Sequence, residues 1–424
     1  MHDLRALRDG VDALRDAMRR RGKLDALAPV VDRAVQLDRD RRLTIQAVEE
    51  RKAARNVATQ EVARRKKSGQ DASELVAPAR SLGEEIARLE RELAVSENEL
   101  QAILLEIPNV TLADVPDGGE EANTVVRSWG TPRPAGSVKP HWDVGEALGI
   151  VDLARGAKIS GSGFVVLRGL GARLARALMS FMIDLHTTEH GYDETWVPFV
   201  VNRASMVGTG QLPKFADDMY AVADDDLFLI PTAEVPLTNL YRDEIIEAAS
   251  LPIGLVAYSP CFRREAGAHG KDTRGLIRVH EFDKVELVHF TTPEASAAQH
   301  EALTRNAERV LQLLELPYRV LLLASGDTGF ASAKTYDLEI YAPGTAKWLE
   351  VSSCSNFLDF QARRANIRYR PASGEKPRFV HTLNGSGVAF PRTIIGLLEH
   401  HQQPDGTVRV PSALQPYLRT DVLR

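Results

Sequence analysis

The chain has 424 residues and a formal net charge of −5, with 44% hydrophobic and 26% charged residues, which is ordinary for a globular protein of two or three domains. No apolar run reaches the roughly 18 residues of a bilayer span, and the first ten residues contain no apolar signal core. The two cysteines, Cys261 and Cys354, form no CxxC pair, so a disulfide framework and a structural zinc site lack support. We therefore expect a cytoplasmic protein whose cysteines are small buried residues.

Residues 28–110 contain no aromatic residue and are rich in Arg, Glu, Ala and Leu. From Leu75 to Ile107, mostly apolar residues recur at steps of four and three, a heptad seam that requires an apposed helix. The sequence SGQD at 68–71 marks the end of one helix and the start of the next. The pattern predicts an antiparallel helical hairpin whose first helix, at ~40 residues, is about 60 Å long and projects as an arm.

The two predicted helices differ in charge. Residues 28–67 carry eleven basic and six acidic side chains, whereas the second helix is acidic. Its glutamates include Glu84, Glu85, Glu90, Glu92, Glu97 and Glu99. A basic projecting helix is typical of contact with a nucleic-acid backbone. Salt bridges between the two helices would produce the same pattern, and the charges alone favour neither interpretation.

A Gly/Pro-rich stretch follows Pro108 and ends near residue 136. These signals predict a helical arm over residues 1–110, a linker over 111–136 and a mixed α and β domain over 137–424. In the last domain, period-two runs joined by hairpins are separated by helical runs, which indicates an antiparallel β-sheet with flanking helices. The expected fold class is therefore α+β. The sequence has no GxxxxGK[ST] loop and no GxGxxG after a strand.

The segment from Phe262 to Phe290 has the alternation of a β-hairpin, with a polar, Gly-rich loop at its centre. In the first run Arg263 and Glu265 share a face. One face of the second run carries Arg278, His280, Phe282, Lys284 and Glu286, with Ile277, Val279, Val285 and Leu287 on the other. Taken alone, such a charged face is typical of a solvent-exposed hairpin.

Along essentially its whole length the chain resembles the bacterial-type seryl-tRNA synthetases, a family of class II aminoacyl-tRNA synthetases. Three short class motifs are present: a helix and strand ending at Pro198, FRRE…RxxEFxxxE beginning at Phe262, and GxGxxxxR ending at Arg392. The longer stretches GTGQLPKF, PTAEVPLTN, AGAHGKDTRGLIRVHEFDKVE, AKTYDLE and SSCSNFLDFQARR resemble the seryl family specifically. One departure is Phe390-Pro391, where many relatives have smaller residues; a proline is tolerated in the first turn of a helix.

The resemblance implies an ATP site. It assigns ATP binding to Arg263, Arg264, Glu265, Val279, Phe282, Glu350, Val351, Ser352, Ser353 and Arg392. Arg263 is expected to bind the α-phosphate and the substrate carboxylate, and Arg392 the far end of the triphosphate; these two are the expected catalytic residues. Glu265 is expected to accept from the adenine amino group and Phe282 to stack on its ring. Glu350 and Ser353 resemble the positions that carry Mg²⁺.

The resemblance also implies a serine site and a tRNA site. The expected serine-binding residues are Thr232, Ala233, Glu234, Glu286, Asn384 and Ser386, with Glu234 taking the ammonium group. The expected tRNA-binding residues on the arm are Arg51, Lys52, Arg55, Arg64 and Arg65. The implied reaction forms seryl-adenylate and then transfers serine to serine tRNA, with selenocysteine tRNA as a second acceptor that the resemblance allows. A homodimer is expected as well.

Two other functions are compatible with a class II core. One is a ligase that loads an amino acid onto a carrier protein, but such relatives typically lack the arm. The other is a non-catalytic tRNA-binding paralogue, which would be expected to have lost Arg263, Glu265 or Arg392. Because both the arm and these residues are present, the sequence favours the synthetase.

Overall fold

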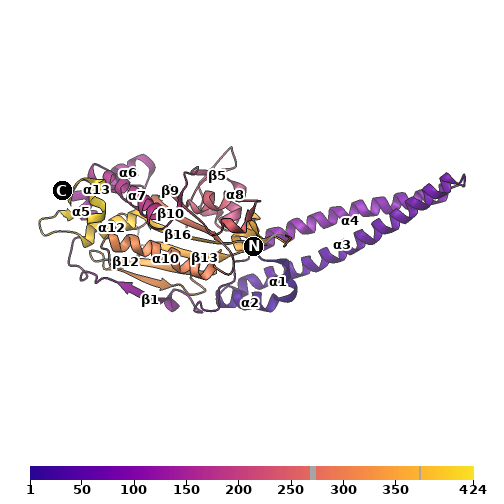
Figure 1. The fold of residues 1–424 in the computed structure, drawn as a ribbon, viewed down its shortest axis with the longest axis horizontal. Coiled ribbons are helices and arrows are strands. Elements are labelled where there is room, and N and C mark those ends of the chain that lie inside the picture. Colours follow the sequence, from indigo (N-terminus) through magenta and orange to yellow (C-terminus); the bar gives the residue numbers. More distant parts are fainter. Residues whose placement is uncertain (268–273, 372–373) are drawn as a thin grey trace. The chain divides into compact units, whose positions relative to one another are not determined.

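The computed structural model describes residues 1–267, 274–371 and 374–424 (Figure 1). The chain divides into two compact units, Met1–Pro108 and Asn109–Arg424. The centre of the predicted hairpin loop, residues 268–273, lies outside the described residues, as does that part of the family-specific stretch beginning at Ala266. Among the helices that the structure describes, none is both long and apolar enough to cross a bilayer.

The first unit is entirely helical. It contains α1 (Leu4–Asp9), α2 (Val11–Arg20), α3 (Leu24–Lys67) and α4 (Ser73–Glu106). Helices α3 and α4 lie side by side as the predicted antiparallel hairpin, here called the arm (Figure 1). With 44 residues, α3 is about 66 Å long. Leu7 and Met18 from the short helices pack with Val31 and Leu104 into a buried apolar cluster near one end of the arm.

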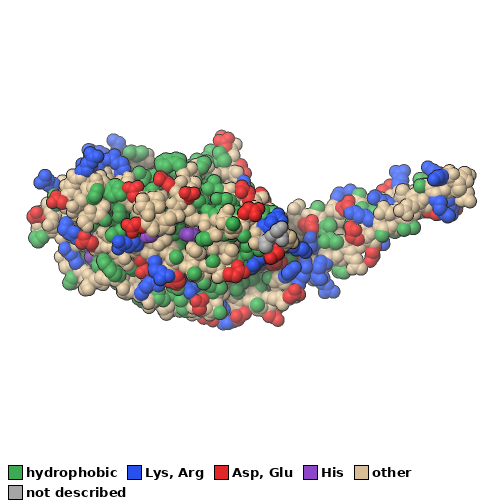
Figure 2. All heavy atoms as spheres, viewed as in Figure 1, with side chains coloured by type: hydrophobic (Ala, Val, Ile, Leu, Met, Phe, Trp, Pro, Cys, Tyr) green, Lys and Arg blue, Asp and Glu red, His purple; other side chains and the backbone are tan. Residues whose placement is uncertain are grey.

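Ion pairs connect the two helices of the arm along their length. Arg33 pairs with Glu99 at 2.6 Å, Arg41 with Glu97 at 2.8 Å, Arg51 with Glu85 at 3.0 Å and Lys52 with Glu90 at 3.1 Å. Figure 2 shows basic and acidic side chains interspersed along this part of the chain. The salt bridging that the charge pattern allowed is therefore present, and it accounts for part of the basic charge of α3.

The second unit is built on an eight-stranded sheet with the order β1-β11-β12-β13-β16-β10-β9-β4. In that order the strands are Thr124–Trp129, Tyr318–Leu322, Lys334–Ala342, Lys347–Leu358, His381–Ala389, Glu281–Thr291, Ile253–Phe262 and Asp193–Glu194. Neighbouring strands pair antiparallel, apart from the parallel pair of β4 and β9. The predicted antiparallel sheet is therefore confirmed.

Three helices cover one face of this sheet: α7 (Leu170–Thr188), α10 (Ser296–Leu313) and α12 (Phe390–His400). Leu178, Leu303 and Ile395, one from each helix, belong to one hydrophobic core cluster with Val285 and Leu383 of the sheet. Since side chains alternate between the faces of a strand, burial of Val285 and Leu383 turns their sequence neighbours to the opposite face. That opposite face carries the polar residues considered below.

Smaller elements complete the unit. The helices are α5 (His141–Ala147), α6 (Leu153–Ser160), α8 (Arg203–Thr209), α9 (Glu234–Asn239), α11 (Phe360–Ala365) and α13 (Gln415–Leu418). The small sheets pair β2 (Val151–Asp152) with β3 (Val166–Leu167), β17 (Val408–Arg409) with β18 (Val422–Leu423), β7 (Leu227–Leu229) with β5 (Val200–Asn202) and β6 (Ala221–Val222), and β14 (Arg368–Arg370) with β8 (Ile245–Glu247) and β15 (Arg378–Phe379).

Two segments differ from the sequence-based reading. Within the stretch read as a linker, residues 124–129 form the edge strand β1, which pairs with β11. Strand β10 begins at Glu281, so the alternation that predicted a strand from Ile277 was wrong for residues 277–280. The physical reason is that backbone N–H groups there bond elsewhere: Leu276 donates to His141 Nε2 and His280 to the Gly163 carbonyl.

Candidate active site

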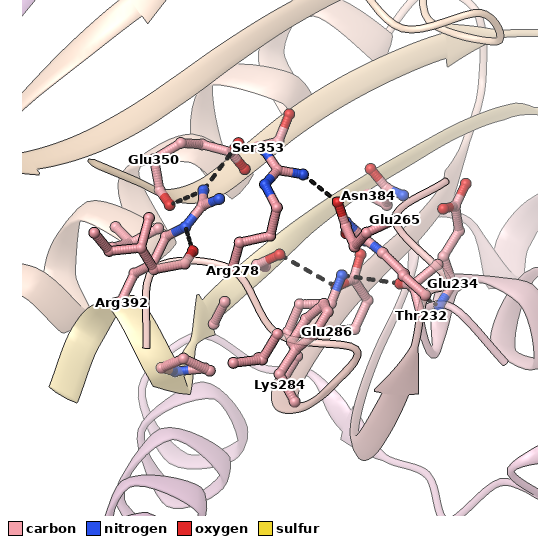
Figure 3. A pocket seen from close by; sticks show the side chains of 18 of the residues that line it. Thr232, Glu234, Glu265, Arg278, Lys284, Glu286, Glu350, Ser353, Asn384 and Arg392 are labelled. Atoms are coloured by element: carbon pink, nitrogen blue, oxygen red, sulfur yellow. Dashed lines mark hydrogen bonds and ion pairs between the residues drawn. The ribbon is translucent and has the colours of Figure 1, made fainter. Parts of the chain in front are cut away.

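A cavity of about 400 Å³ lies on the face of the sheet opposite the core helices (Figure 3). Thirteen of the residues assigned to the ATP and serine sites line it: Thr232, Glu234, Arg263, Glu265, Val279, Phe282, Glu286, Glu350, Val351, Ser353, Asn384, Ser386 and Arg392. They come from segments up to 160 positions apart in the sequence, between Thr232 and Arg392. The fold thus brings most of the predicted site residues together around one hollow.

Strand alternation explains how the sheet supplies these side chains. Phe282, Lys284 and Glu286 occupy every second position of β10, and Asn384 and Ser386 do so on β16. The two strands pair antiparallel, with Glu286 opposite Ser386. Residues in such a register have Cβ atoms about 5 Å apart, so their side chains can share one ligand.

Three of the predicted ATP- and serine-site residues do not line this cavity. The Ala233 side chain packs into a neighbouring apolar cluster and is fully buried. The Arg264 guanidinium lies over the Tyr220 ring, 5.6 Å from its centroid. The Ser352 hydroxyl donates to the Ser386 carbonyl at 2.7 Å, because it points to the other face of β13 from Ser353. The expected arm residues belong to the first unit.

Several lining residues had been given no role from the sequence. They are Leu276, Ile277, Arg278, Lys284, Ser355, Phe357, Ala389 and Pro391. The alternation of β10 was a usable signal for Lys284, which lies between Phe282 and Glu286 on the same strand face. Arg278 had a signal too, since a second arginine near Glu265 in a hairpin offers it an ion-pair partner.

Two arginines line the cavity. The Arg263 Nε donates to the Pro231 carbonyl at 3.3 Å, and its guanidinium carbon lies 5.1 Å from the centroid of the Phe282 ring. Arg392 follows Pro391 in the first turn of α12. Its Nη1 donates to the Glu350 carbonyl at 2.7 Å and lies 3.4 Å from the Glu350 carboxylate. A flat guanidinium held in this way can bind a phosphate in a fixed orientation.

Two buried carboxylates line the cavity as well. Glu234 accepts a hydrogen bond of 2.6 Å from the Gln361 amide, and burial followed by the charge of Glu286 raises the pKa of Glu234 to about 7. The ammonium of Lys284 lies 2.6 Å from the Glu286 carboxylate and donates to the Thr232 hydroxyl at 2.9 Å. Figure 3 shows Lys284 between Thr232 and Glu286. Buried anions beside hydroxyl groups form a suitable environment for a small molecule with an amine and a hydroxyl.

Oxygen donors on β12 and β13 fit a magnesium ion. Asp337 pairs in register with Ser353, and the Asp337 Oδ1 atom is buried without a hydrogen-bond partner among the described residues. Burial, followed by the charge of Glu350, holds the pKa of Asp337 well above its usual range. Mg²⁺ prefers such donors and usually takes only one or two carboxylates beside substrate phosphates. No cluster of three or more His, Cys, Asp or Glu able to hold a metal occurs within residues 1–267, 274–371 and 374–424.

The antiparallel sheet with an arginine-lined cavity on its open face is that of a class II aminoacyl-tRNA synthetase, and residues 219–401 match the family model described as tRNA synthetase class II core domain (G, H, P, S and T). Residues 1–111 match the seryl-tRNA synthetase N-terminal domain. The chain is 66% identical to a serine–tRNA ligase from Gemmatimonas aurantiaca over the full length of both proteins. It is also 54% identical to that of Thermomicrobium roseum, covering 99% of this chain and 93% of the relative. The chain belongs to the seryl-tRNA synthetase family.

Solved structures agree with this assignment. The fold is similar to that of seryl-tRNA synthetase from Pyrococcus horikoshii complexed with ATP, with a TM-score of 0.95, 38% identity and coverage of 100% of this chain and 99% of that one. It is similar as well to the cytoplasmic serine–tRNA ligase from Naegleria fowleri in complex with AMP, with a TM-score of 0.88, 30% identity and the same coverage.

Proposed function

We propose that this chain attaches L-serine to serine tRNA at the expense of ATP. The observation that carries the proposal is the lining of the cavity, which combines the cations Arg263 and Arg392 with the buried carboxylates Glu234 and Glu286. The arginines suit the phosphates of ATP, and the carboxylates suit the ammonium group of an amino acid. The names of the similar proteins, which are serine–tRNA ligases, support the same substrates.

In the first step, a serine carboxylate oxygen attacks the α-phosphorus of ATP, and the bond to pyrophosphate breaks. Arg263 would bind both the attacking carboxylate and the α-phosphate, and Arg392 the far phosphates. Their contribution is to hold two anions together and to stabilise the charge that grows at phosphorus. Mg²⁺, when held by Glu350 and Ser353, would neutralise phosphate charge there. Glu265 would accept from the adenine amino group, and Phe282 would stack on the ring.

In the second step, a ribose hydroxyl of the terminal adenosine of the tRNA attacks the acyl carbon, and AMP leaves. Neither step requires a nucleophile from the protein. Cys261 and Cys354 are fully buried, and burial raises the pKa of both thiols, to about 12 for Cys354. Neutral, enclosed thiols are poor nucleophiles, which is compatible with a reaction between the substrates alone.

The serine end of the cavity would select its substrate by hydrogen bonds and volume. Asn384, Ser386 and Glu286 are buried polar groups with which the hydroxyl of serine could bond. Bound alanine would leave these polar groups without hydrogen-bond partners. The resulting loss of binding free energy is larger than the discrimination that an apolar pocket achieves against a ligand with one added group. Threonine would be excluded by the volume of its methyl group.

We assign tRNA binding to the arm, through Arg51, Lys52, Arg55, Arg64 and Arg65. Arg55 forms no ion pair with any other described residue, and Arg64 and Arg65 pair with Glu61 at the surface. Exposed ion pairs contribute about 0–1 kcal/mol each, so phosphates can displace the glutamates at little cost. The long extra arm of serine tRNA would supply those phosphates, and selenocysteine tRNA is a second acceptor of the same kind.

We also propose a cytoplasmic homodimer in which the arm of one subunit binds tRNA at the active site of the other. The segment ending at Pro198, which resembles the dimer-forming class motif, exposes the Trp196 side chain at 74%, and Val200, two positions beyond it, is 38% exposed. Exposed apolar groups of this size favour a protein interface, and a two-fold pair is the commonest one. A stable, fully active monomer in analytical ultracentrifugation would rule the dimer out.

The decisive experiment is ATP–pyrophosphate exchange with each of the twenty amino acids, followed by aminoacylation of serine tRNA. Serine-dependent exchange and serine transfer to tRNA are the expected results. Exchange with serine but transfer only to a carrier protein would favour the ligase alternative. Binding of tRNA without exchange for any amino acid would favour the non-catalytic paralogue.

A further inference from the structure

The two carboxylates at the serine end of the cavity have partners of different charge. Glu286, 2% exposed, lies against the ammonium of Lys284 at 2.6 Å. Glu234, 7% exposed, accepts instead from the neutral amide of Gln361 at 2.6 Å. Two anions in one buried pocket repel each other, and the partner of each decides how much of its charge remains available to a ligand.

The orientation of the Gln361 amide is fixed by its surroundings. Gln361 lies on α11 and is 1% exposed. Its Nε2 donates to the Glu234 carboxylate and, at 3.2 Å, to the Thr209 carbonyl, while its Oε1 accepts from the Thr382 hydroxyl at 2.7 Å. A carboxylate and a carbonyl can only accept, so the nitrogen must face them. Gln361 therefore presents a hydrogen-bond donor to Glu234 without adding positive charge.

Lys284 acts differently on Glu286. Its ammonium is nearly fully buried and is shared between the Glu286 carboxylate and the Thr232 hydroxyl. Such a pair is close to neutral as a unit, and the remaining lone pairs of Glu286 can still accept a hydrogen bond. The Ser386 hydroxyl, 3.4 Å from the Glu286 carboxylate, is placed to donate such a hydrogen bond.

We propose that Gln361 and Lys284 are positioning residues. Through them, Glu234 binds the ammonium group of the amino acid and Glu286 binds its hydroxyl group. Gln361 holds Glu234 in place through a neutral donor, without pairing it directly with a cation, so that Glu234 can bind the ammonium group. Lys284 neutralises Glu286, so that Glu286 accepts from the uncharged hydroxyl and does not compete for the ammonium. This inference rests on the proposed function, since it presumes that serine is the ligand.

The first test replaces Gln361 by methionine, which keeps the volume and removes the donor. A hydrogen bond to a charged group is worth enough to predict a loss of about 10-fold or more in kcat/KM for serine, with the KM for ATP changed by less than about twofold. Alanine, which is assayed for comparison as a poor alternative substrate, carries the same ammonium group as serine. The serine-to-alanine ratio is therefore expected to stay the same in Gln361→Met.

The pH dependence gives a readout that a purely structural role would not move. The charged groups acting on Glu234 are Glu286, Lys284 and Arg263, and Gln361→Met leaves all three in place. The hydrogen bond from Gln361 lowers the pKa of Glu234, so its loss raises that pKa further above 7. The acid limb of kcat/KM for serine is therefore expected to move to higher pH.

The second test is Lys284→Met, which leaves Glu286 without its cation. Only serine has the hydroxyl, so this variant is expected to lower the serine-to-alanine ratio, in contrast to Gln361→Met. Glu399→Gln is the matched control, because Glu399 is a fully buried carboxylate, bonded to His141, that does not line the cavity. It is expected to lower stability while leaving the KM for serine and the acid limb unchanged.

If Gln361→Met fails to fold, Thr382→Val removes the hydroxyl that orients the amide and is expected to shift the acid limb in the same direction. The proposal is overturned if the foldable variant leaves the acid limb in place, or if both cavity variants change the serine-to-alanine ratio equally. Absence of serine-dependent exchange in the unaltered protein would instead overturn the proposed function.

Discussion

The guanidinium of Arg278 donates a hydrogen bond to the carboxylate of Glu265 at the cavity. The two residues stand thirteen positions apart, both within the segment that connects β9 to β10. Glu265 has a φ of 51°, a left-handed conformation that is uncommon for a residue with a side chain. The ion pair therefore fixes a carboxylate whose backbone is already constrained, at the position proposed to receive the adenine amino group.

We predict that Arg278→Ala weakens ATP binding more than serine binding. Without its partner, Glu265 loses its fixed orientation, so the KM for ATP in pyrophosphate exchange should rise about 10-fold, the worth of one charge-assisted hydrogen bond. Arg203→Ala is the control, because Arg203 forms an exposed pair with Asp226 and lines no part of the cavity. A larger effect on the KM for serine than on that for ATP would contradict the proposed position of the nucleotide.

Arg263→Ala is predicted to abolish adenylate formation while leaving the fold and tRNA binding intact. A guanidinium that bridges two anions in the transition state has no substitute among its neighbours, so the loss should be about 1,000-fold or more in exchange rate. Arg263→Lys keeps the charge without the planar fork and is expected to recover only part of the activity. Exchange at the normal rate in Arg263→Ala would remove this residue from the site.

Shortening the arm is predicted to separate the two steps of the reaction. Removal of residues 43–94, closed by a short linker, keeps the buried cluster that includes Val31, Leu37 and Leu104. Because the described cavity-lining residues all belong to the second unit, serine-dependent exchange should stay within about threefold of normal, while aminoacylation falls by orders of magnitude with the lost phosphate contacts.

A second experiment keeps the whole arm and replaces five basic residues together with neutral ones: Arg51, Lys52, Arg55, Arg64 and Arg65. Each lost phosphate contact should flatten the salt dependence of tRNA binding by nearly one unit of slope. Replacing Glu50, Glu84 and Glu92 with glutamine serves as the control, because their partners are Gln46, Arg80 and Arg88. If the protein lacking residues 43–94 charges tRNA at the normal rate, the arm is a structural coiled coil and does not bind tRNA.

Stability is predicted to fall as the pH is lowered from about 6.5 to 4. Burial is the main cause that lowers the pKa of His300 to about 4 and that of His186 to about 3, against ~6.5 in an unfolded chain. The unfolded state therefore binds these protons first, so their contribution is complete above pH 6.5 and declines by about 1.4 kcal/mol per pH unit for each histidine below it. Scanning calorimetry between pH 8 and pH 5 measures this decline.

His300→Gln tests one of these groups directly. The His300 ring nitrogen Nε2 bonds to the Cys354 carbonyl at 2.8 Å, and a glutamine amide can donate there without titrating. Between pH 6.5 and 5 the unfolding free energy of the variant should fall less steeply with decreasing pH than that of the unaltered protein. The difference in slope should correspond to close to one bound proton. An unchanged slope would mean that His300 is not a buried neutral group in solution.

Local patterns were enough to predict the arm and most of the cavity. Apolar steps of four and three between Leu75 and Ile107 require a partner helix, and α4 supplies that seam against α3. Alternation along β10 placed Phe282, Lys284 and Glu286 on one face, because side-chain direction in a strand is a local property. The motif resemblance then named residues that the fold brings together.

Other features depend on contacts between distant segments. Residues 124–129 look like a linker because their strand is stabilised by pairing with β11, almost two hundred positions away. Residues 277–280 have the alternation of a strand, but the N–H of His280 donates to Gly163 and that of the preceding Leu276 donates to His141. In both cases a distant partner for the backbone N–H and C=O groups decided the structure, and the local sequence does not identify that partner.

The sequence by itself determined which residue types are present and, along β10, which side chains share a strand face. Only the tertiary structure decided which of them touch. Gln361 on α11 meets Glu234 across 127 positions of chain, and Lys284 meets Thr232 across 52. These pairings follow from how the elements pack, because the position and charge of a buried group depend on neighbours that close packing selects from the whole chain.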